Sequence, residues 1–184
     1  MADVAYPRDL ALIAAIFGLA AFVWAGWAQE HPPRGPVWRV VLAVLGLGGL
    51  ALAAVGIAMA VRVWETPTAI EPGTPEFFFY VVVFWVELIG AGIIAFFTIR
   101  AGMSDFVAPI VLGVVGIHFF ALAPVFHQPF LFFPAVLLTA AALAAAFIAS
   151  DDVARSFWCG LFGAPVFLAF GAWAAVAAAQ TLPE

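Results

Sequence analysis

Two side chains that can exchange protons, Glu87 and His118, lie inside apolar segments long enough to cross a bilayer. Each is 13 residues from the nearer end of the short polar turn Arg100 to Asp105. At about 1.5 Å of rise per helical residue, both lie roughly 20 Å from that turn, on neighbouring helices. Ionisable groups at membrane depth are costly and usually face a partner or a wet cavity. We therefore expect Glu87 and His118 to form a ligand or proton site.

The pair has two interpretations. A glutamic acid surrounded by hydrocarbon can hold its proton and donate a hydrogen bond, or it can give that proton to a nearby imidazole. Histidine titrates near neutral pH, which makes His118 a plausible proton acceptor. In the alternative interpretation, Glu87 and His118 only hydrogen-bond helices together. Opposite placement of the two side chains on the helical hairpin would rule out a shared site.

The residues that follow Glu87 suggest space beside it. Gly90 and Gly92 leave room for another helix or for a small ligand. Phe84 and Trp85 supply aromatic surface, although on a helix Trp85 points away from Glu87.

A second group of candidates lies near one predicted membrane surface. His127, Glu65 and Arg62 are expected as outer-face contributors to a site, and Arg62 is placed to pair with Glu65 three residues on. Carboxylates and a histidine can hold a divalent metal, but no tight ligand spacing is present. A solvated acidic loop is the favoured interpretation, so no metal site is predicted.

Composition indicates the class of protein. The chain of 184 residues is 67% hydrophobic and only 9% charged, against about 25% charged in soluble domains. All six cations are arginine, which excludes a Schiff base on lysine. The net charge of −5 offers no basic surface for nucleic acid. The single cysteine, Cys159, cannot form an internal disulfide, and no sequence feature predicts a cofactor.

The hydropathy pattern predicts an all-α polytopic membrane protein in one transmembrane domain, residues 1–184. Each segment is near the ~20 residues that a span requires, and proline and glycine clusters separate them. Six transmembrane helices are expected, arranged as three consecutive hairpins and covering about 10–28, 37–63, 77–99, 106–126, 130–148 and 157–179. Pro165 is expected to kink or break the last helix.

Small residues predict where helices approach closely. Spacing of the form small-x-x-x-small lets backbones touch, although an alanine-rich chain also produces it by chance. Three pairs show it: Gly49 with Ala53, Gly56 with Ala60, and Gly160 with Ala164.

The arginine distribution predicts orientation. Four arginines fall at one predicted end of the bundle and two at the other. The positive-inside rule then places both termini outside.

The stretch from Gly116 to Phe126, GIHFFALAPVF, resembles a signature of uncharacterised small bacterial multi-helix membrane proteins that reads roughly GxHFxPLAxxF. Ala121 stands where that signature has proline, and a proline occurs at Pro124 instead. The resemblance covers about a dozen residues. It implies a bacterial inner-membrane protein, points to His118, and assigns no chemistry.

Three functions are consistent with these features. The first is a transporter-like or small-molecule-binding protein with a small polar cavity in the outer half of the membrane, proton-linked through Glu87 and His118, whose small size suggests a homodimer. The second is a membrane-embedded enzyme acting on a lipid or isoprenoid, with Glu87 as general acid. The third is an accessory subunit with no chemistry. Expected partners are the lipid bilayer and a small-molecule or lipid ligand.

Overall fold

The computed structural model describes residues 4–148 and 152–181, and this part of the chain is helical without strands. Two short 3-10 turns, η1 (Ser104–Phe106) and η2 (Pro129–Leu131), precede α4 and α5. Each long helix begins and ends within three residues of its predicted bounds, which confirms the predicted fold class. The long helices are α1 (Pro7–Trp27), α2 (Pro36–Arg62), α3 (Pro75–Arg100), α4 (Val107–Val125), α5 (Phe132–Phe147) and α6 (Arg155–Ala179).

Local sequence explains where the helices start. Pro7, Pro36 and Pro75 occupy the first helical position, where the missing N–H costs no hydrogen bond. At the start of α3, the Thr74 hydroxyl accepts a hydrogen bond from the Phe77 N–H at 3.2 Å. Pro165 was expected to kink or break the last helix, but α6 continues through it as one helix.

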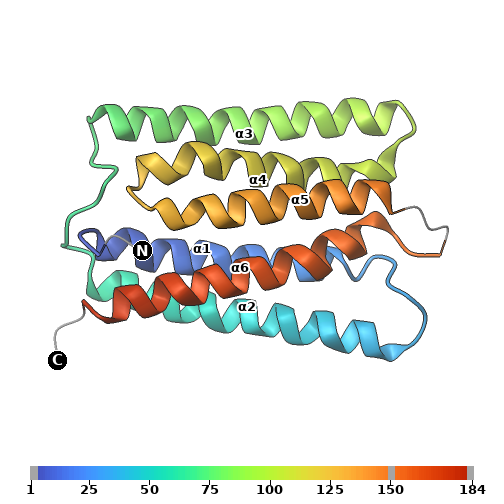
Figure 1. The fold of residues 1–184 in the computed structure, drawn as a ribbon, viewed down its shortest axis with the longest axis horizontal. Helices are drawn as coiled ribbons and strands as arrows, with labels where there is room; N and C mark the ends of the chain where they lie inside the picture. The colour runs from blue at the N-terminus through green and yellow to red at the C-terminus, as the bar shows by residue number, and fades with distance from the viewer. Residues whose placement is uncertain (1–3, 149–151, 182–184) are drawn as a thin grey trace.

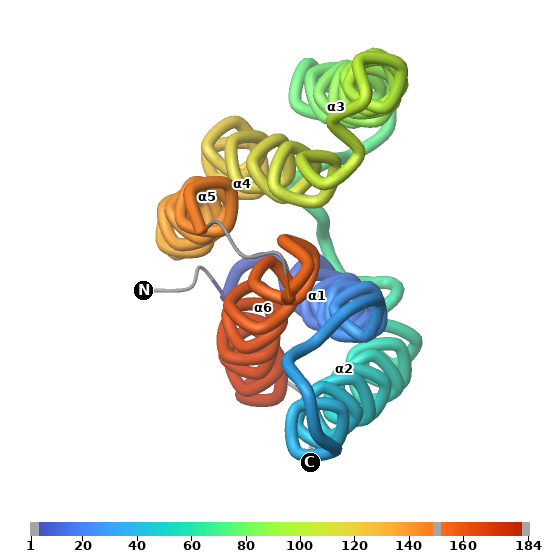
Figure 2. The backbone as a smooth tube through the Cα atoms, turned by 90° about the vertical axis from the view of Figure 1, so that its right-hand side faces the viewer, coloured from blue at the N-terminus to red at the C-terminus, as the bar shows by residue number. Residues whose placement is uncertain are grey.

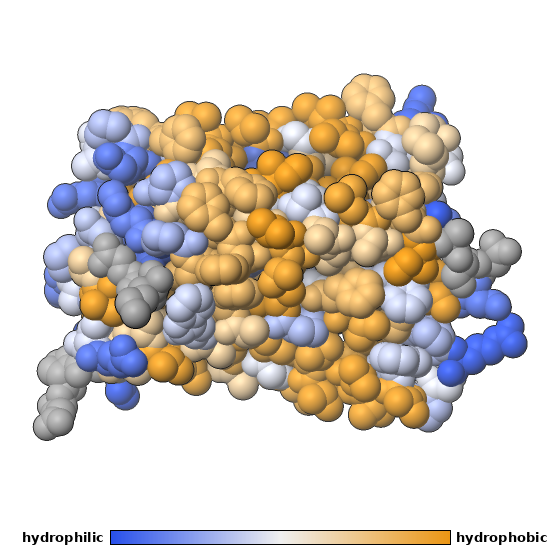
Figure 3. All heavy atoms as spheres, viewed as in Figure 1, coloured by the Kyte–Doolittle hydropathy of each residue, from blue (hydrophilic) through white to orange (hydrophobic). Residues whose placement is uncertain are grey.

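The distribution of hydrophobic residues over the surface indicates which environment surrounds this fold. In the part of the chain that the structure describes, six helical stretches are long and apolar enough to cross a membrane. Figure 3 shows an apolar band across the middle of the face in view, with hydrophilic residues gathered at both ends. Helices of this length arranged across such a band define a multi-pass membrane protein.

The predicted arrangement of the helices as three consecutive hairpins is not confirmed, because several helices pack on more than one neighbour. Successive helices run in opposite directions (Figure 1), but α6 packs closely on α1 and also contacts α2. Helix α5 packs more extensively on α4 than on α6. Helix α3 packs mainly on α4 and is set apart from α1, α2 and α6 in the end-on view (Figure 2).

Glycines hold α1 against α2 and α6. A Cβ added at Gly49 would lie 2.6 Å from the Gly18 carbonyl oxygen, and one at Gly56 would lie 2.8 Å from the Ala15 Cα. A Cβ at Gly160 of α6 would collide with the backbone of Trp24 in α1. Two of the predicted small-residue pairs therefore begin with a glycine at the α1–α2 contact, and the third begins with a glycine at the α1–α6 contact.

At the end of the bundle that holds the start of α1, a buried acid fixes the loop between α2 and α3. The Asp9 carboxylate accepts hydrogen bonds from the Thr68 hydroxyl at 2.6 Å and the Ala69 N–H at 2.7 Å. Its neighbour Arg8 donates to the Trp64 carbonyl at 2.8 Å. These contacts attach the loop to α1, and through the loop they set where α3 begins.

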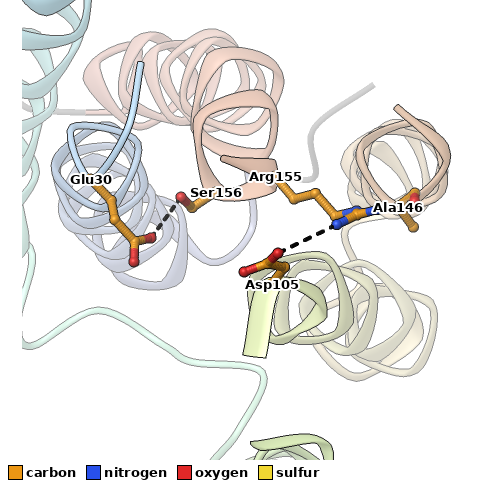
Figure 4. Close-up of polar contacts among 5 residues, drawn as sticks. All are labelled: Glu30, Asp105, Ala146, Arg155 and Ser156. Atoms are coloured by element: carbon orange, nitrogen blue, oxygen red, sulfur yellow. Dashed lines mark hydrogen bonds and ion pairs between the residues drawn. The ribbon is translucent and has the colours of Figure 1, made fainter. Parts of the chain in front are cut away.

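Polar contacts also tie the opposite end of the bundle together (Figure 4). The Ser156 hydroxyl of α6 lies 2.8 Å from a Glu30 carboxylate oxygen after α1. Arg155 donates to the Ala146 carbonyl at 3.3 Å and lies 3.9 Å from the Asp105 carboxylate. These contacts join the ends of α1, α4, α5 and α6.

The glycine contacts predict that Gly56→Ala destabilises the protein, whereas Gly92→Ala does not. A methyl group at position 56 meets the α1 backbone, and overpacking of this kind costs about 1–3 kcal/mol. A methyl group at position 92 meets nothing within 4 Å and improves helix propensity. Unfolding of both variants in the same detergent checks this. Equal stability of the two variants would contradict the packing described for α1 and α2.

Candidate functional site

The structure brings Glu87 and His118 together in the middle of the membrane-spanning region. Nδ1 of His118 lies 3.1 Å from Oε1 of Glu87, and the side chains are only 14% and 21% exposed, respectively. The orientation does not meet hydrogen-bond geometry, so Nδ1 is enclosed without a formed bond.

Helix periodicity places both side chains on the α3–α4 contact. Glu87 lies two turns after Tyr80 on one face of α3, and both residues are half-buried while Val82 and Val86 face outward. On α4, His118 is followed by Phe119, and their ring centroids are 4.2 Å apart. Glu87 and His118, which are equally far from the α3–α4 turn in sequence, therefore lie at the same depth in the bundle.

A cavity of about 430 Å³ lies beside this pair, between α1, α3 and α4. Its 18 lining residues carry few polar atoms, and seven of them are aromatic. Only Tyr80, Glu87, His118 and the Trp24 indole interrupt the apolar surface. The aromatic lining residues are Phe17, Trp24, Tyr80, Phe84, Phe119, Phe126 and Phe167.

The cavity opens sideways, toward the hydrocarbon of the bilayer. Its lining includes Ile16 and Val23 of α1, each 57% exposed, and Phe84 of α3, which is 45% exposed. These exposed residues lie on α1 and α3, and α3 is set apart from α1 in the end-on view (Figure 2). At its inner wall, Phe17 and Phe167 are almost fully buried.

One expectation about this cavity was wrong. It was expected to be polar, but its walls are apolar and aromatic apart from the few polar groups named above. Its placement in the outer half of the membrane stays a prediction, and its lining extends from Glu87 and His118 toward the start of α3 and the end of α4. Neither Gly90 nor Gly92 lines it, although a Cβ at either glycine would meet open space. Phe84 lines it, and Trp85 is exposed elsewhere, as expected.

The outer-face candidates lie away from the cavity. His127 follows α4 with a left-handed backbone (φ 53°) and stacks on Tyr6, with ring centroids 5.8 Å apart. Glu65 lies in the loop after α2, and Arg62 is exposed at the end of α2. The structure shows no ion pair between Arg62 and Glu65, and no contact brings His127 to either of them within the described ranges.

Two further pockets lie at the ends of the bundle. A polar pocket of about 570 Å³ is lined by Arg8, Glu65 and Glu71 with neighbouring loop residues. A smaller one of about 110 Å³ adjoins Glu30 and Arg155 at the other end. No group of three or more metal-ligating side chains occurs in residues 4–148 and 152–181.

Several residues that shape the site were missed from the sequence. Phe17 and Trp24 of α1 line the cavity, although they lie 70 and 63 residues before Glu87 in the sequence. Nothing in an apolar helix marks which of its aromatic residues will face a cavity. Asp9, which positions the loop before α3, did carry a signal, because it is a carboxylate placed immediately before the predicted apolar segment 10–28.

These features define a class: a six-helix membrane protein with an acid–base pair at mid-membrane depth, on the wall of an apolar cavity that opens to lipid. No protein-family model, curated protein or solved structure matches the chain.

The contact between Glu87 and His118 predicts energetic coupling. In a double-mutant cycle with Glu87→Ala and His118→Ala, the two effects on the free energy of unfolding should differ from additivity by about 1 kcal/mol, because each variant removes the same contact. Reversible unfolding in mixed micelles measures the three variants. Additive effects would show that the two side chains do not interact.

Proposed function

We propose that this protein binds a lipophilic small molecule that enters from the bilayer, with Glu87 and His118 as its polar contacts. The observation that carries the proposal is the apolar cavity of about 430 Å³ with one acid–base pair on its wall. Small-molecule sites typically combine such a volume and apolar lining with a few convergent polar groups. Binding is linked to the proton that the pair Glu87 and His118 gains or loses, and such proton-linked binding is the transporter-like function that we propose.

The shape of the cavity favours binding over the other two functions considered. A lipid-facing opening suits a ligand dissolved in the membrane, whereas a water-soluble substrate would need a path to an aqueous face. An enzyme would need a further reactive group near the pair, and the cavity lining supplies only the Tyr80 hydroxyl. An accessory subunit with no chemistry has no need of a hollow beside an acid and a base.

The proposed location is a bacterial inner membrane, with both termini outside. Arg34, Arg39, Arg100 and Arg155 belong to one end of the bundle, while Arg8 and Arg62 belong to the other (Figure 1). Cytoplasmic ends of membrane proteins carry the excess of arginine and lysine, which supports this orientation. The bacterial assignment rests on the resemblance around His118.

A carbene-generating hydrocarbon tests the binding site. In lipid nanodiscs, photolysis of 3-trifluoromethyl-3-phenyldiazirine should label Phe17 and Phe119 in a saturable manner, because these side chains are buried except toward the cavity. Lipid-facing residues such as Val82 should label in proportion to probe concentration. Peptide mass spectrometry separates the two patterns.

Two variants of α3 provide the matched control. Val83→Trp places a large ring in the cavity and should abolish the saturable labelling of Phe17 and Phe119. Val82→Trp makes the same change on the lipid-facing side and should leave that labelling intact. Absence of saturable labelling in the unmodified protein, or equal labelling in both variants, would refute the proposed binding site.

A further inference from the structure

The cavity lining contains an acidic side chain without a permanently cationic one to balance it. Its lining residues include one carboxylate, Glu87, and neither an arginine nor a lysine. When Glu87 is ionised and His118 is neutral, the cavity holds one uncompensated negative charge. Such a charge in an apolar environment is strongly unfavourable unless a cation joins it.

Within residues 4–148 and 152–181, no other element supplies that cation to the cavity. On α4, which packs against α3, the one titratable side chain is His118. The ionisable residues of α1, Arg8 and Asp9, lie at its first turn and bind the Trp64 carbonyl and the loop at Thr68 and Ala69. Helix α6 contributes only Phe167 to the cavity, and Tyr80 is the remaining titratable group in the lining. Charge balance at Glu87 therefore comes either from a proton or from a ligand.

The aromatic walls favour a cationic ligand. Ring faces attract ammonium groups, and cages of aromatic side chains are the usual means of binding quaternary ammonium ions. Tyr80 and Phe84 approach the cavity from the same helix as Glu87, while Phe119 lies beside His118. An apolar, aromatic cavity with one carboxylate thus complements a molecule that is both lipophilic and positively charged.

We infer that the ligand is a lipophilic monocation, such as a hydrophobic amine or quaternary ammonium ion, for which Glu87 is the counter-ion. This inference rests on the proposed function and names its ligand class. Before binding, Glu87 and His118 share one added proton, so the cavity is neutral. When the cation enters, that proton leaves to water, Glu87 remains ionised, and the cavity is neutral again. Binding and protonation therefore compete for the same site.

Two photoreactive probes that differ in charge test the inference. The neutral probe is 3-trifluoromethyl-3-phenyldiazirine, and the cationic probe is its para-trimethylammoniomethyl derivative, whose charge does not titrate. In zwitterionic nanodiscs at pH 8, the cationic probe should label Phe17 and Phe119 at about tenfold lower concentration than the neutral one. One proton is released for each cation bound. The apparent affinity for the cationic probe should therefore fall by up to about tenfold for each unit by which the pH is lowered, as the pair becomes protonated.

Two carboxylate variants separate the site from general surface charge. Glu87→Gln should remove the preference for the cationic probe and its pH dependence, and cooperative unfolding of this variant in detergent shows that the fold is intact. Glu76→Gln removes an exposed acid from the first turn of the same helix and should change neither.

The outcomes distinguish the two proposals. Equal saturable labelling by both probes, unchanged in Glu87→Gln, would overturn the cation inference and leave the lipophile-binding site standing. Saturable labelling by neither probe would overturn the binding site itself. Cation-selective labelling that survives Glu87→Gln would overturn the role of Glu87 as the counter-ion.

Discussion

The close approach of α1 to its neighbours is the constraint on which the rest of this structure depends. In lipid, helices gain little from burying apolar surface, so association relies on packing and on small residues that let backbones touch. Gly49 and Gly56 bring α2 onto α1, and Gly160 brings α6 onto it. Helix α3 has no comparable contact, because its glycines, Gly90 and Gly92, meet open space. The bundle is consequently tight on one side of α1 and loose on the other.

This asymmetry creates the site. Helix α3 is held by α4, by the loop that Asp9 fixes to α1, and by the contact between Glu87 and His118. The space left between α3 and α1 becomes the cavity, and its mouth faces the hydrocarbon. A polar pair placed there can be reached by a membrane-dissolved molecule without a water-filled path. Packing that leaves one helix loosely attached thus provides both the volume and the entry route.

The sequence predicted the helices and the depth of the pair, because helical rise converts residue counts into distance. It could not predict that Phe17 and Trp24 face Glu87, since α1 is apolar on all sides and hydropathy does not encode its rotation. For the same reason the cavity was expected to be polar, when its polar groups are Glu87, His118, Tyr80 and the Trp24 indole alone. The grouping of α6 with α1 and α2 depends on glycine contacts between residues distant in sequence, which spacing within one helix cannot specify.

The distance between Glu87 and His118 in a bilayer tests the central claim most directly. Solid-state NMR can measure dipolar coupling between a ¹³C-labelled glutamate carboxyl and ¹⁵N-labelled histidine in the protein reconstituted in lipid. We predict a short contact, consistent with the 3.1 Å approach of Nδ1 to Oε1, that is lost in Glu87→Gln but retained in Glu76→Gln. Absence of that contact in the unmodified protein would show that the two groups do not share a site and would contradict the account.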